Sequence, residues 1–216
     1  MLLINQAYAY VNHNYVNPQD KIIEICCSWN DQLNDNILTY HINIDKKAEK
    51  GLKKIVENSL NHWAEMLSNN IRFEKEKNKK DADIQIDFKR DIGEERGGKT
   101  VTHLDKMGFI DHVQIYISKT SYGSSLDLPT IEQISKHEIG HSLGLGHSNF
   151  AKSLMYPLVD TKILKIQKCE IAAVSHINTL KLFEREDYDL PQIQLKLFER
   201  EDYDLPQISL GSKYKC

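Results

Sequence analysis

One stretch of eleven residues constrains this chain more than any other. It reads HEIGHSLGLGH, from His137 to His147, and it contains three of the nine histidines among the 216 residues. On a helix, residues four apart lie on one face, so His137 and His141 can direct their imidazoles at a single point. A helix commonly ends at a glycine such as Gly144, because glycine adopts the left-handed conformation without steric cost. The stretch therefore predicts a helix, a sharp turn and a return of His147 toward the other two histidines.

The chemistry of this arrangement is that of a zinc site. Three imidazoles give a tetrahedral zinc ion three ligands and leave the fourth position to a water molecule, as in catalytic zinc sites. We therefore expect His137, His141 and His147 to bind one catalytic Zn²⁺. The carboxylate of Glu138 lies beside the metal rather than on it, and we expect it to act as general base and acid toward that water. The spacing His-Glu-x-x-His-x-x-Gly-x-x-His matches the signature of the metzincin zinc peptidases.

A methionine follows this signature at a short distance. Met155 stands eight residues after the third histidine, in the sequence SLMYP. HEIGHSLGLGHS followed by SLMYP resembles the matrixins, the matrix-metalloproteinase branch of the metzincins. Residues 37–44, 51–66 and 81–88 resemble the first strand, the first helix and the third strand of the matrixin domain. The resemblance covers about residues 36–177 of the chain.

The resemblance implies an α+β, zincin-like fold, with a twisted mixed five-stranded sheet, three helices and an active-site cleft. It also implies that Met155 supports the metal site from below, and that residues 99–105 form the strand at the upper rim of the cleft. An extended peptide would add to that strand through main-chain hydrogen bonds, and residues 156–159 would line the main specificity pocket. The implied activity is that of a zinc-dependent metalloendopeptidase, which hydrolyses internal bonds of extended polypeptides through a metal-activated water and a glutamate general base.

The residue patterns predict strands and helices in the same order. Apolar residues alternate with polar ones in the strand candidates, and they recur every three to four positions in the helix candidates. The expected strands are residues 37–44, 81–88, 99–105 and 112–118. The expected helices are residues 46–67, a helix that begins near residue 129 or 130 and holds the histidines, and about residues 168–183. Strands and helices that alternate in runs favour a mixed α and β domain.

We expect three parts along the chain. Residues 1–35 form an N-terminal segment, residues 36–180 the matrixin-like catalytic domain, and residues 181–216 a C-terminal tail with a tandem 15-residue duplication. An Ala-x-Ala sequence within residues 1–9 belongs either to the remnant of a signal peptide or to a plain terminus. The first interpretation predicts an extracellular, secreted protein.

Composition narrows the classes of partner. Charged residues make up 27% and hydrophobic residues 40% of the chain, which is ordinary for a globular protein. The formal net charge is -3, so no basic surface favours nucleic acid. No apolar run approaches the length of a membrane span. We expect a monomer whose partner is a polypeptide substrate.

Further metal sites find little support in the sequence. Animal matrixins hold a second, structural zinc ion through histidines and an aspartate, and they also hold calcium ions. This chain has His103 and His112 in the corresponding region, and Asp91, Glu94 and Asp105 are possible oxygen ligands. We expect the two histidines to be partly exposed strand residues rather than ligands of a structural Zn²⁺ or Ca²⁺.

The pairing of the four cysteines stays open. Cys26 and Cys27 are adjacent, and adjacent cysteines seldom bond to each other because the geometry is strained. Either one could pair with Cys169 or Cys216 in an oxidising compartment. Buried free thiols are equally compatible with the sequence.

Two other functions remain open. A catalytically silent zinc-binding module would normally lack the glutamate of the signature, whereas Glu138 is present here. A peptidase for short peptides or cell-wall peptides would share the zinc chemistry but would need a blocked or narrow cleft. The sequence does not distinguish these shapes of cleft.

Overall fold

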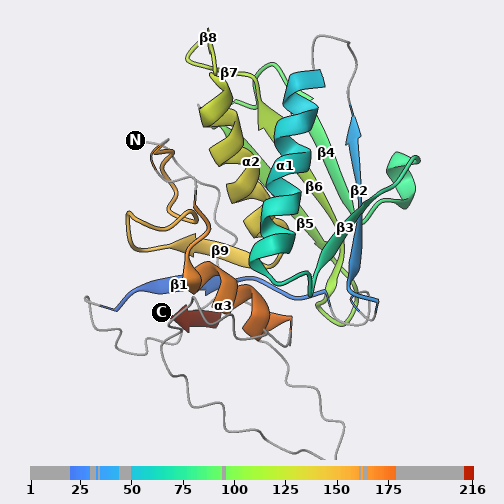
Figure 1. Ribbon diagram of the computed structural model, residues 1–216, viewed down its shortest axis with the longest axis vertical. Helices are drawn as coiled ribbons and strands as arrows, with labels where there is room; N and C mark the ends of the chain where they lie inside the picture. Colours follow the sequence, from blue (N-terminus) through green and yellow to red (C-terminus); the bar gives the residue numbers. More distant parts are fainter. Residues whose placement is uncertain are drawn as a thin grey trace, which may run out of the picture.

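A twisted mixed sheet forms the central layer of the protein, and two helices cover one of its faces (Figure 1). The computed structural model describes residues 20–29, 33, 35–43, 50–93, 96–160, 162, 165–178 and 212–216. The strands of this sheet are β2 (Ile37–Asn43), β3 (Arg72–Lys75), β4 (Ile84–Lys89), β5 (Gly98–Leu104) and β6 (Ile110–Ser118). They lie in the order β3-β2-β4-β6-β5. β5 runs antiparallel to β6 and so forms an antiparallel edge on an otherwise parallel sheet.

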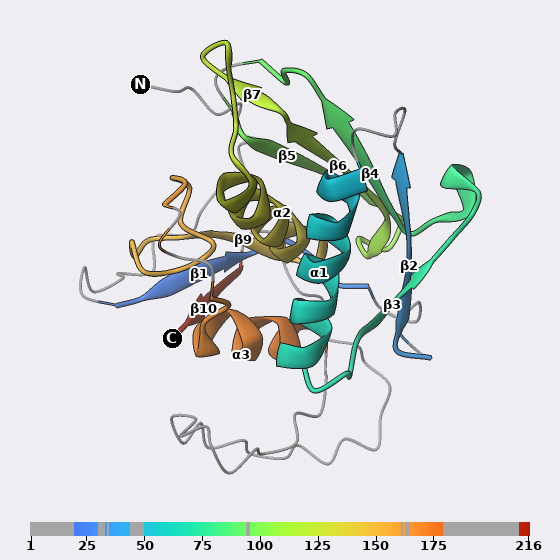
Figure 2. The ribbon, with the colours of Figure 1, turned by 45° about the horizontal axis from the view of Figure 1, so that its top comes forward.

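The helices of the described residues are α1 (Lys50–Met66), α2 (Leu128–Ser142) and α3 (Lys168–Ile177). α1 and α2 lie side by side on the sheet, and α3 lies at one end of this pair (Figures 1 and 2). α2 begins at Leu128, one residue before the predicted start, and the side chain of Asp127 caps it by accepting a hydrogen bond from the backbone N–H of Thr130 at 2.9 Å. Within the described residues, no helix combines the length and the apolar character that a membrane span requires.

The core lies between the sheet and the first two helices. Alternate positions of the central strands are buried there, namely Ile84, Ile86, Val113, Ile115 and Ile117. α1 contributes Trp63, which is fully buried and donates from its indole N–H to the carbonyl of Lys136 at 2.9 Å. A buried indole N–H without a partner would cost free energy, so this bond favours one alignment of α1 against α2.

A second sheet lies beyond the C-terminal end of α2 (Figure 1). Its antiparallel strands lie in the order β10-β1-β9, and they are β1 (Ile22–Ile25), β9 (Leu145–Ser148) and β10 (Ser212–Lys215). A short hairpin of β7 (Thr120–Ser121) and β8 (Ser124–Ser125) precedes α2, and a 3-10 helix spans Lys79–Asp81. The sequence pattern predicts none of these short elements, because two to four residues are too few to show a periodicity.

The α+β fold with a five-stranded mixed sheet and three helices is confirmed. β3 was not among the predicted strands. The predicted last helix reaches residue 183, whereas α3 ends at Ile177. The side-chain amide of Asn178 donates to the carbonyls of Val174 at 3.0 Å and Leu143 at 3.1 Å, which closes α3 against the end of α2. The tandem duplication at 181–210 lies outside the described residues.

The cysteine pairs differ from the expectation for the adjacent residues. Cys26 bonds to Cys27, and Cys169 bonds to Cys216. Both alternatives raised from the sequence for Cys26 and Cys27, a bond to Cys169 or Cys216 and buried free thiols, are therefore wrong. Cys169 in the first turn of α3 meets Cys216 directly after β10, and both of these elements contact β1. Once those two cysteines have paired, Cys26 and Cys27 have only each other as partners.

Candidate metal centre

Three imidazoles converge where α2 ends and β9 begins. His137 and His141 lie one turn apart on α2, and His147 lies on β9. The ring centroids of His137 and His141 are 4.6 Å apart, and the ring of His147 lies 5.4 Å and 5.0 Å from them, respectively. One ring nitrogen from each residue lies within 4.8 Å of the others. Across the described ranges, this is the one cluster of three such side chains that could hold a metal ion.

The turn at Gly144 brings the third histidine back toward the helix. Gly144 has a φ of +96°, which lies in the left-handed region that favours glycine. Its carbonyl accepts a hydrogen bond from the backbone N–H of Cys26 at 2.9 Å. β9 then pairs with β1, so main-chain bonds to an early segment of the chain position His147.

The two helical histidines are each held in one tautomer. The Nδ1–H of His137 donates to the carbonyl of Leu154 at 2.8 Å, and that of His141 donates to the carbonyl of Leu145 at 2.7 Å. Nε2 of each ring therefore carries the lone pair that a metal requires. Burial lowers the pKa of His137 and of His141 to about 4, and it also lowers the pKa of His147. All three rings are neutral at pH 7, as metal ligands must be.

Glu138 faces the edge strand β5. It is 5% exposed, and its Oε2 accepts a hydrogen bond from Thr100 Oγ1 at 2.6 Å. Burial raises the pKa of Glu138, whereas His137 and the bond from Thr100 act in the opposite direction. Gly98 leaves room for the carboxylate, because a Cβ at that position would overlap it. The motif predicts Glu138 but neither Thr100 nor Gly98, although the alternation of β5 places both on one face.

The segment around Met155, residues 153–157, packs against α2 and is called the methionine turn below. Met155 is fully buried, and its Sδ would lie 2.5 Å from a Cβ built on Gly140 of α2, so any side chain at that position would force Met155 to shift. Glu170 of α3 supports the turn, since its Oε1 accepts from the N–H of Leu154 at 2.9 Å and from the hydroxyl of Ser153 at 2.5 Å. The carbonyl of Leu154 in turn orients the first histidine. Sequence reasoning missed Glu170, because nothing local marks a helical glutamate as a partner of a distant turn.

Replacement of Glu170 by alanine is expected to loosen this turn. The change leaves the Leu154 N–H, the Ser153 hydroxyl and the Gln167 N–H without their acceptor. Each unpaired buried donor costs about 1–3 kcal/mol, so we expect the free energy of unfolding to fall by about 3 kcal/mol. Urea unfolding measures this change, and Glu74→Ala on an exposed position of β3 is the control, with an effect below about 0.5 kcal/mol. Equal losses in the two variants would contradict the assigned role.

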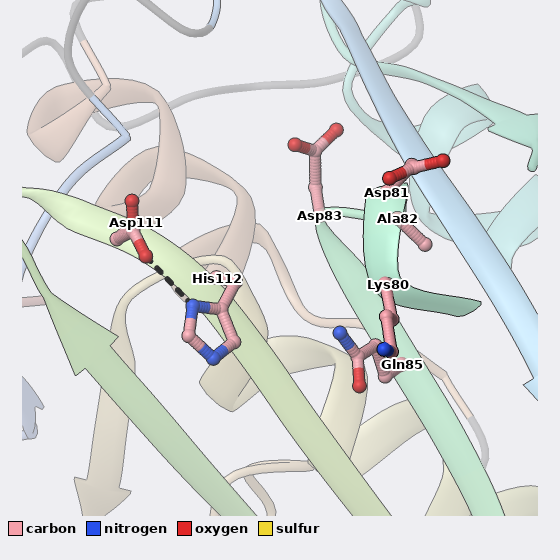
Figure 3. A pocket seen from close by; sticks show the side chains of 7 residues that line it. All are labelled: Lys80, Asp81, Ala82, Asp83, Gln85, Asp111 and His112. Carbon is pink, nitrogen blue, oxygen red and sulfur yellow. Dashed lines mark hydrogen bonds and ion pairs between the residues drawn. The ribbon is translucent and has the colours of Figure 1, made fainter. Parts of the chain in front are cut away.

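His103 and His112 form a separate pair on β5 and β6. Their rings stack at a centroid distance of 4.2 Å, and the Nδ1–H of His112 donates to Asp111 at 2.7 Å (Figure 3). His103 and Asp105 have a His-x-Asp spacing, but the Asp105 carboxylate accepts two backbone N–H groups of the following turn, at 2.8 and 2.9 Å. Glu94 lies outside the described residues. The described part of the chain brings no third ligand to this pair.

A polar hollow lies where β4 and β6 begin (Figure 3). It is lined by Lys80, Asp81, Ala82, Asp83, Gln85, Asp111 and His112. Its carboxylates already have protein partners, since Asp83 accepts from Thr39 Oγ1 at 2.7 Å and Asp81 accepts from Asn78 Nδ2 at 2.6 Å. Through these hydrogen bonds the carboxylates stabilise the 3-10 helix and its junction with β4. We therefore assign no ligand to the polar hollow.

The mixed sheet with its edge strand beside a three-histidine centre defines a protein of the metzincin class. The family model of the matrixins matches residues 28–179, and the chain belongs to this family. Metalloendoproteinase 5-MMP of Arabidopsis thaliana is 27% identical over 157 residues, which cover 65% of this chain and 43% of that protein. Metalloendoproteinase 1 of Glycine max is 26% identical over 143 residues, with 60% and 45% covered. The chain thus spans less than half the length of these two curated relatives.

Proposed function

We propose that this chain is a zinc-dependent metalloendopeptidase that hydrolyses internal peptide bonds of extended polypeptides, with residues 36–180 as its catalytic domain. The convergence of three neutral imidazoles beside a buried carboxylate carries the proposal. The printed names of the relatives, which are metalloendoproteinases, support it. We also propose a secreted monomer, on the basis of the N-terminal sequence and the composition.

The three-histidine cluster fits a zinc ion. Catalytic zinc has three protein ligands in a tetrahedral set and favours imidazole nitrogen, whereas calcium and magnesium require oxygen ligands. His137, His141 and His147 would hold the ion, since their rings are neutral and one nitrogen of each lies within 4.8 Å of the others. A bound zinc ion supplies Lewis acidity, which lowers the pKa of a water and polarises a scissile carbonyl.

Glu138 would move the proton. Its carboxylate takes a proton from the attacking water and returns it to the nitrogen of the leaving amine, so the peptide C–N bond breaks and a carboxylic acid and an amine form. Thr100 donates to Oε2 of this carboxylate and orients it from β5. Because Thr100 occupies Oε2, Oε1 is the oxygen that would accept the proton of the water.

The edge strand β5 fits an extended substrate. β5 pairs with β6 on one side, and none of the strands described pairs with its other side. Thr100 joins this strand to Glu138, so a peptide added along the free edge would pass beside the metal centre. Main-chain hydrogen bonds of this kind bind long polypeptides, which favours an endopeptidase over a peptidase restricted to short peptides.

Cleavage of an unfolded protein tests the proposed function. The purified chain is loaded with zinc and incubated with casein, the cut positions are mapped by mass spectrometry, and the zinc content is measured by atomic absorption. We expect cuts at internal bonds, loss of cleavage after removal of zinc with 1,10-phenanthroline, and recovery when zinc is returned. Zinc binding without cleavage of any substrate would favour the silent zinc-binding module. Cleavage confined to short peptides would favour the short-peptide peptidase.

A further inference from the structure

The strand that carries the third histidine contains a β-bulge. β9 pairs with β1 through two regular pairs, Ile23 with Ser148 and Ile25 with Leu145. Between these pairs β1 has one residue, Glu24, whereas β9 has two, Gly146 and His147. Bulges of this kind redirect side chains and are common next to active sites. Glu24 is therefore the residue of β1 that lies across from the third histidine.

Glu24 and His147 lie on the same face of the paired strands. The four residues of the regular pairs are buried, whereas Glu24 is exposed and Gly146 and His147 are half-buried. Gly146 provides the room that Glu24 needs, because a Cβ at this position would lie 2.7 Å from Glu24 Cβ. The side chain of Glu24 thus starts directly beside the residue that precedes the third histidine, and its rotatable bonds let the carboxylate turn toward the ring.

The ring of His147 lacks the support that the other two histidines have. His137 and His141 each donate from one ring nitrogen to a backbone carbonyl. Among the described residues, the ring of His147 has no hydrogen-bond partner. One of its nitrogens belongs to the metal cluster, so the other is left over. A histidine that binds a metal generally donates this second N–H to a carboxylate, a carbonyl or water.

Glu24 supplies a negative charge near this ring. Burial lowers the pKa of His147, and the charge of Glu24 acts in the opposite direction. Within the part of the chain that the structure describes, the Glu24 carboxylate has no hydrogen-bond or ion-pair partner of its own. The residue opposite Glu24 on β10 is Lys213, which is therefore the competing partner for the carboxylate. A role of Glu24 at the metal centre has to be separated from a role in holding β10.

We propose that Glu24 is a positioning residue of the metal centre, whose carboxylate accepts a hydrogen bond from the second ring nitrogen of His147. The bond fixes the orientation of the ring and leaves the lone pair of the first nitrogen for the metal. Glu24 thereby does for the third histidine what backbone carbonyls do for the two helical ones. The inference rests on the proposed zinc site, and it adds a residue of β1 that the histidine signature does not contain.

Zinc affinity is the first measurement. Competition with a chromogenic chelator gives the dissociation constant of zinc for wild type, Glu24→Ala and Glu24→Gln. Loss of the hydrogen-bond partner of a metal ligand weakens metal binding by about 10–100-fold, and we expect this loss in Glu24→Ala. Glutamine keeps an oxygen that accepts the N–H, so we expect a loss below about tenfold in Glu24→Gln. Because Glu24 is exposed, urea unfolding of the zinc-free variants is expected to match that of wild type.

The tautomer of His147 is the second measurement, and it needs neither zinc nor activity. Two-dimensional ¹⁵N–¹H spectra of the zinc-free protein at neutral pH show which ring nitrogen carries the proton. The signals of His147 are identified by their loss in His147→Gln. We expect one tautomer in wild type and in Glu24→Gln, and a mixture of both tautomers in Glu24→Ala, since the acceptor is then absent.

Lys213→Ala and Glu74→Ala are the controls. Lys213→Ala removes the competing partner on β10, and Glu74→Ala removes an exposed glutamate on β3 of the five-stranded sheet. We expect wild-type zinc affinity and a single tautomer of His147 from both variants.

The outcomes separate this inference from the proposed function. Equal zinc affinity in wild type and Glu24→Ala overturns the inference, and so does an unchanged tautomer. Equal losses in Glu24→Ala and Glu24→Gln overturn it too, because the charge alone would then act on the metal. A loss of the same size in Lys213→Ala would mean that Glu24 acts by holding β10, which also overturns it.

Activity decides the proposed function by itself. If wild type binds zinc but cuts no casein, the proposed function fails, while the two measurements on Glu24 still decide the inference. A wild type that binds no zinc overturns both.

Discussion

Glu138→Gln is expected to abolish peptidase activity while the metal centre stays intact. Glutamine keeps the size of the side chain and can still accept a hydrogen bond from Thr100, but it cannot take a proton from water. General-base catalysis contributes about 10²–10⁴-fold, so we expect kcat to fall by about 10³-fold or more. His137, His141 and His147 are unchanged, so the zinc content is expected to equal that of wild type. Initial rates of casein cleavage and zinc analysis on the same preparation measure both quantities.

The control for this variant is Glu65→Gln. Glu65 is an exposed glutamate on α1, so the same chemical change is made there at a position that faces solvent. We expect Glu65→Gln to cleave casein at the wild-type rate. Loss of zinc together with activity in Glu138→Gln would mean that the carboxylate maintains the structure of the centre. Full activity would exclude Glu138 as the general base.

Gly144→Ala is expected to impair the fold and the metal centre together. Gly144 has a φ of +96°, and an added Cβ would overlap the carbonyl of Cys27 and lie 2.8 Å from Ile177 Cδ1. The turn has to move, and His147 moves with it because it follows only three residues later. We expect the free energy of unfolding to fall by about 3 kcal/mol. Zinc affinity is expected to fall by about tenfold or more, since the third ligand is displaced.

Gly123→Ala is the control that separates the cost of backbone strain from the cost of steric overlap. Gly123 has a φ of +77° in the turn between β7 and β8, and nothing lies within 4 Å of an added Cβ. This variant bears only the backbone cost of about 1–2 kcal/mol and should keep wild-type zinc affinity. Urea unfolding and competition with a zinc chelator give the two quantities for both variants. If Gly144→Ala is no worse than Gly123→Ala, the close approach to Cys27 has no energetic role.

The convergence of the three histidines could be predicted because its geometry is largely local. A four-residue spacing aligns His137 and His141, and a glycine two residues after the last turn of α2 returns the chain toward them. Thr100 and Glu170 could not be predicted in the same way. Their hydrogen bonds cross 38 and 16 positions of sequence, respectively, and they depend on how β5 and α3 pack against α2 and the methionine turn. Spacing carries no information on such packing.

The central sheet was predicted in outline for a similar reason. Its longer strands show alternation over six residues or more, whereas β3 has four residues and β9 lies inside the histidine signature. β1 and β10 are equally short, and their pairing joins segments from opposite parts of the chain. The bond between Cys26 and Cys27 was missed because adjacent pairs are rare. The bond that leaves them as partners, between Cys169 and Cys216, spans 47 positions of sequence and could not be predicted from the pattern.

The pairing of β9 with β1 also sets the order in which the centre can assemble during folding. The backbone N–H of Ile22 donates to the side chain of Asn149, just after β9, across 127 positions of sequence. Closing so long a loop costs entropy and slows the step that depends on it. α2 can align two imidazoles as soon as the helix forms, whereas His147 reaches its place only after distant segments have met. Binding of zinc by all three histidines is then a late step of folding. The rate of zinc binding therefore measures how fast the tertiary structure is completed.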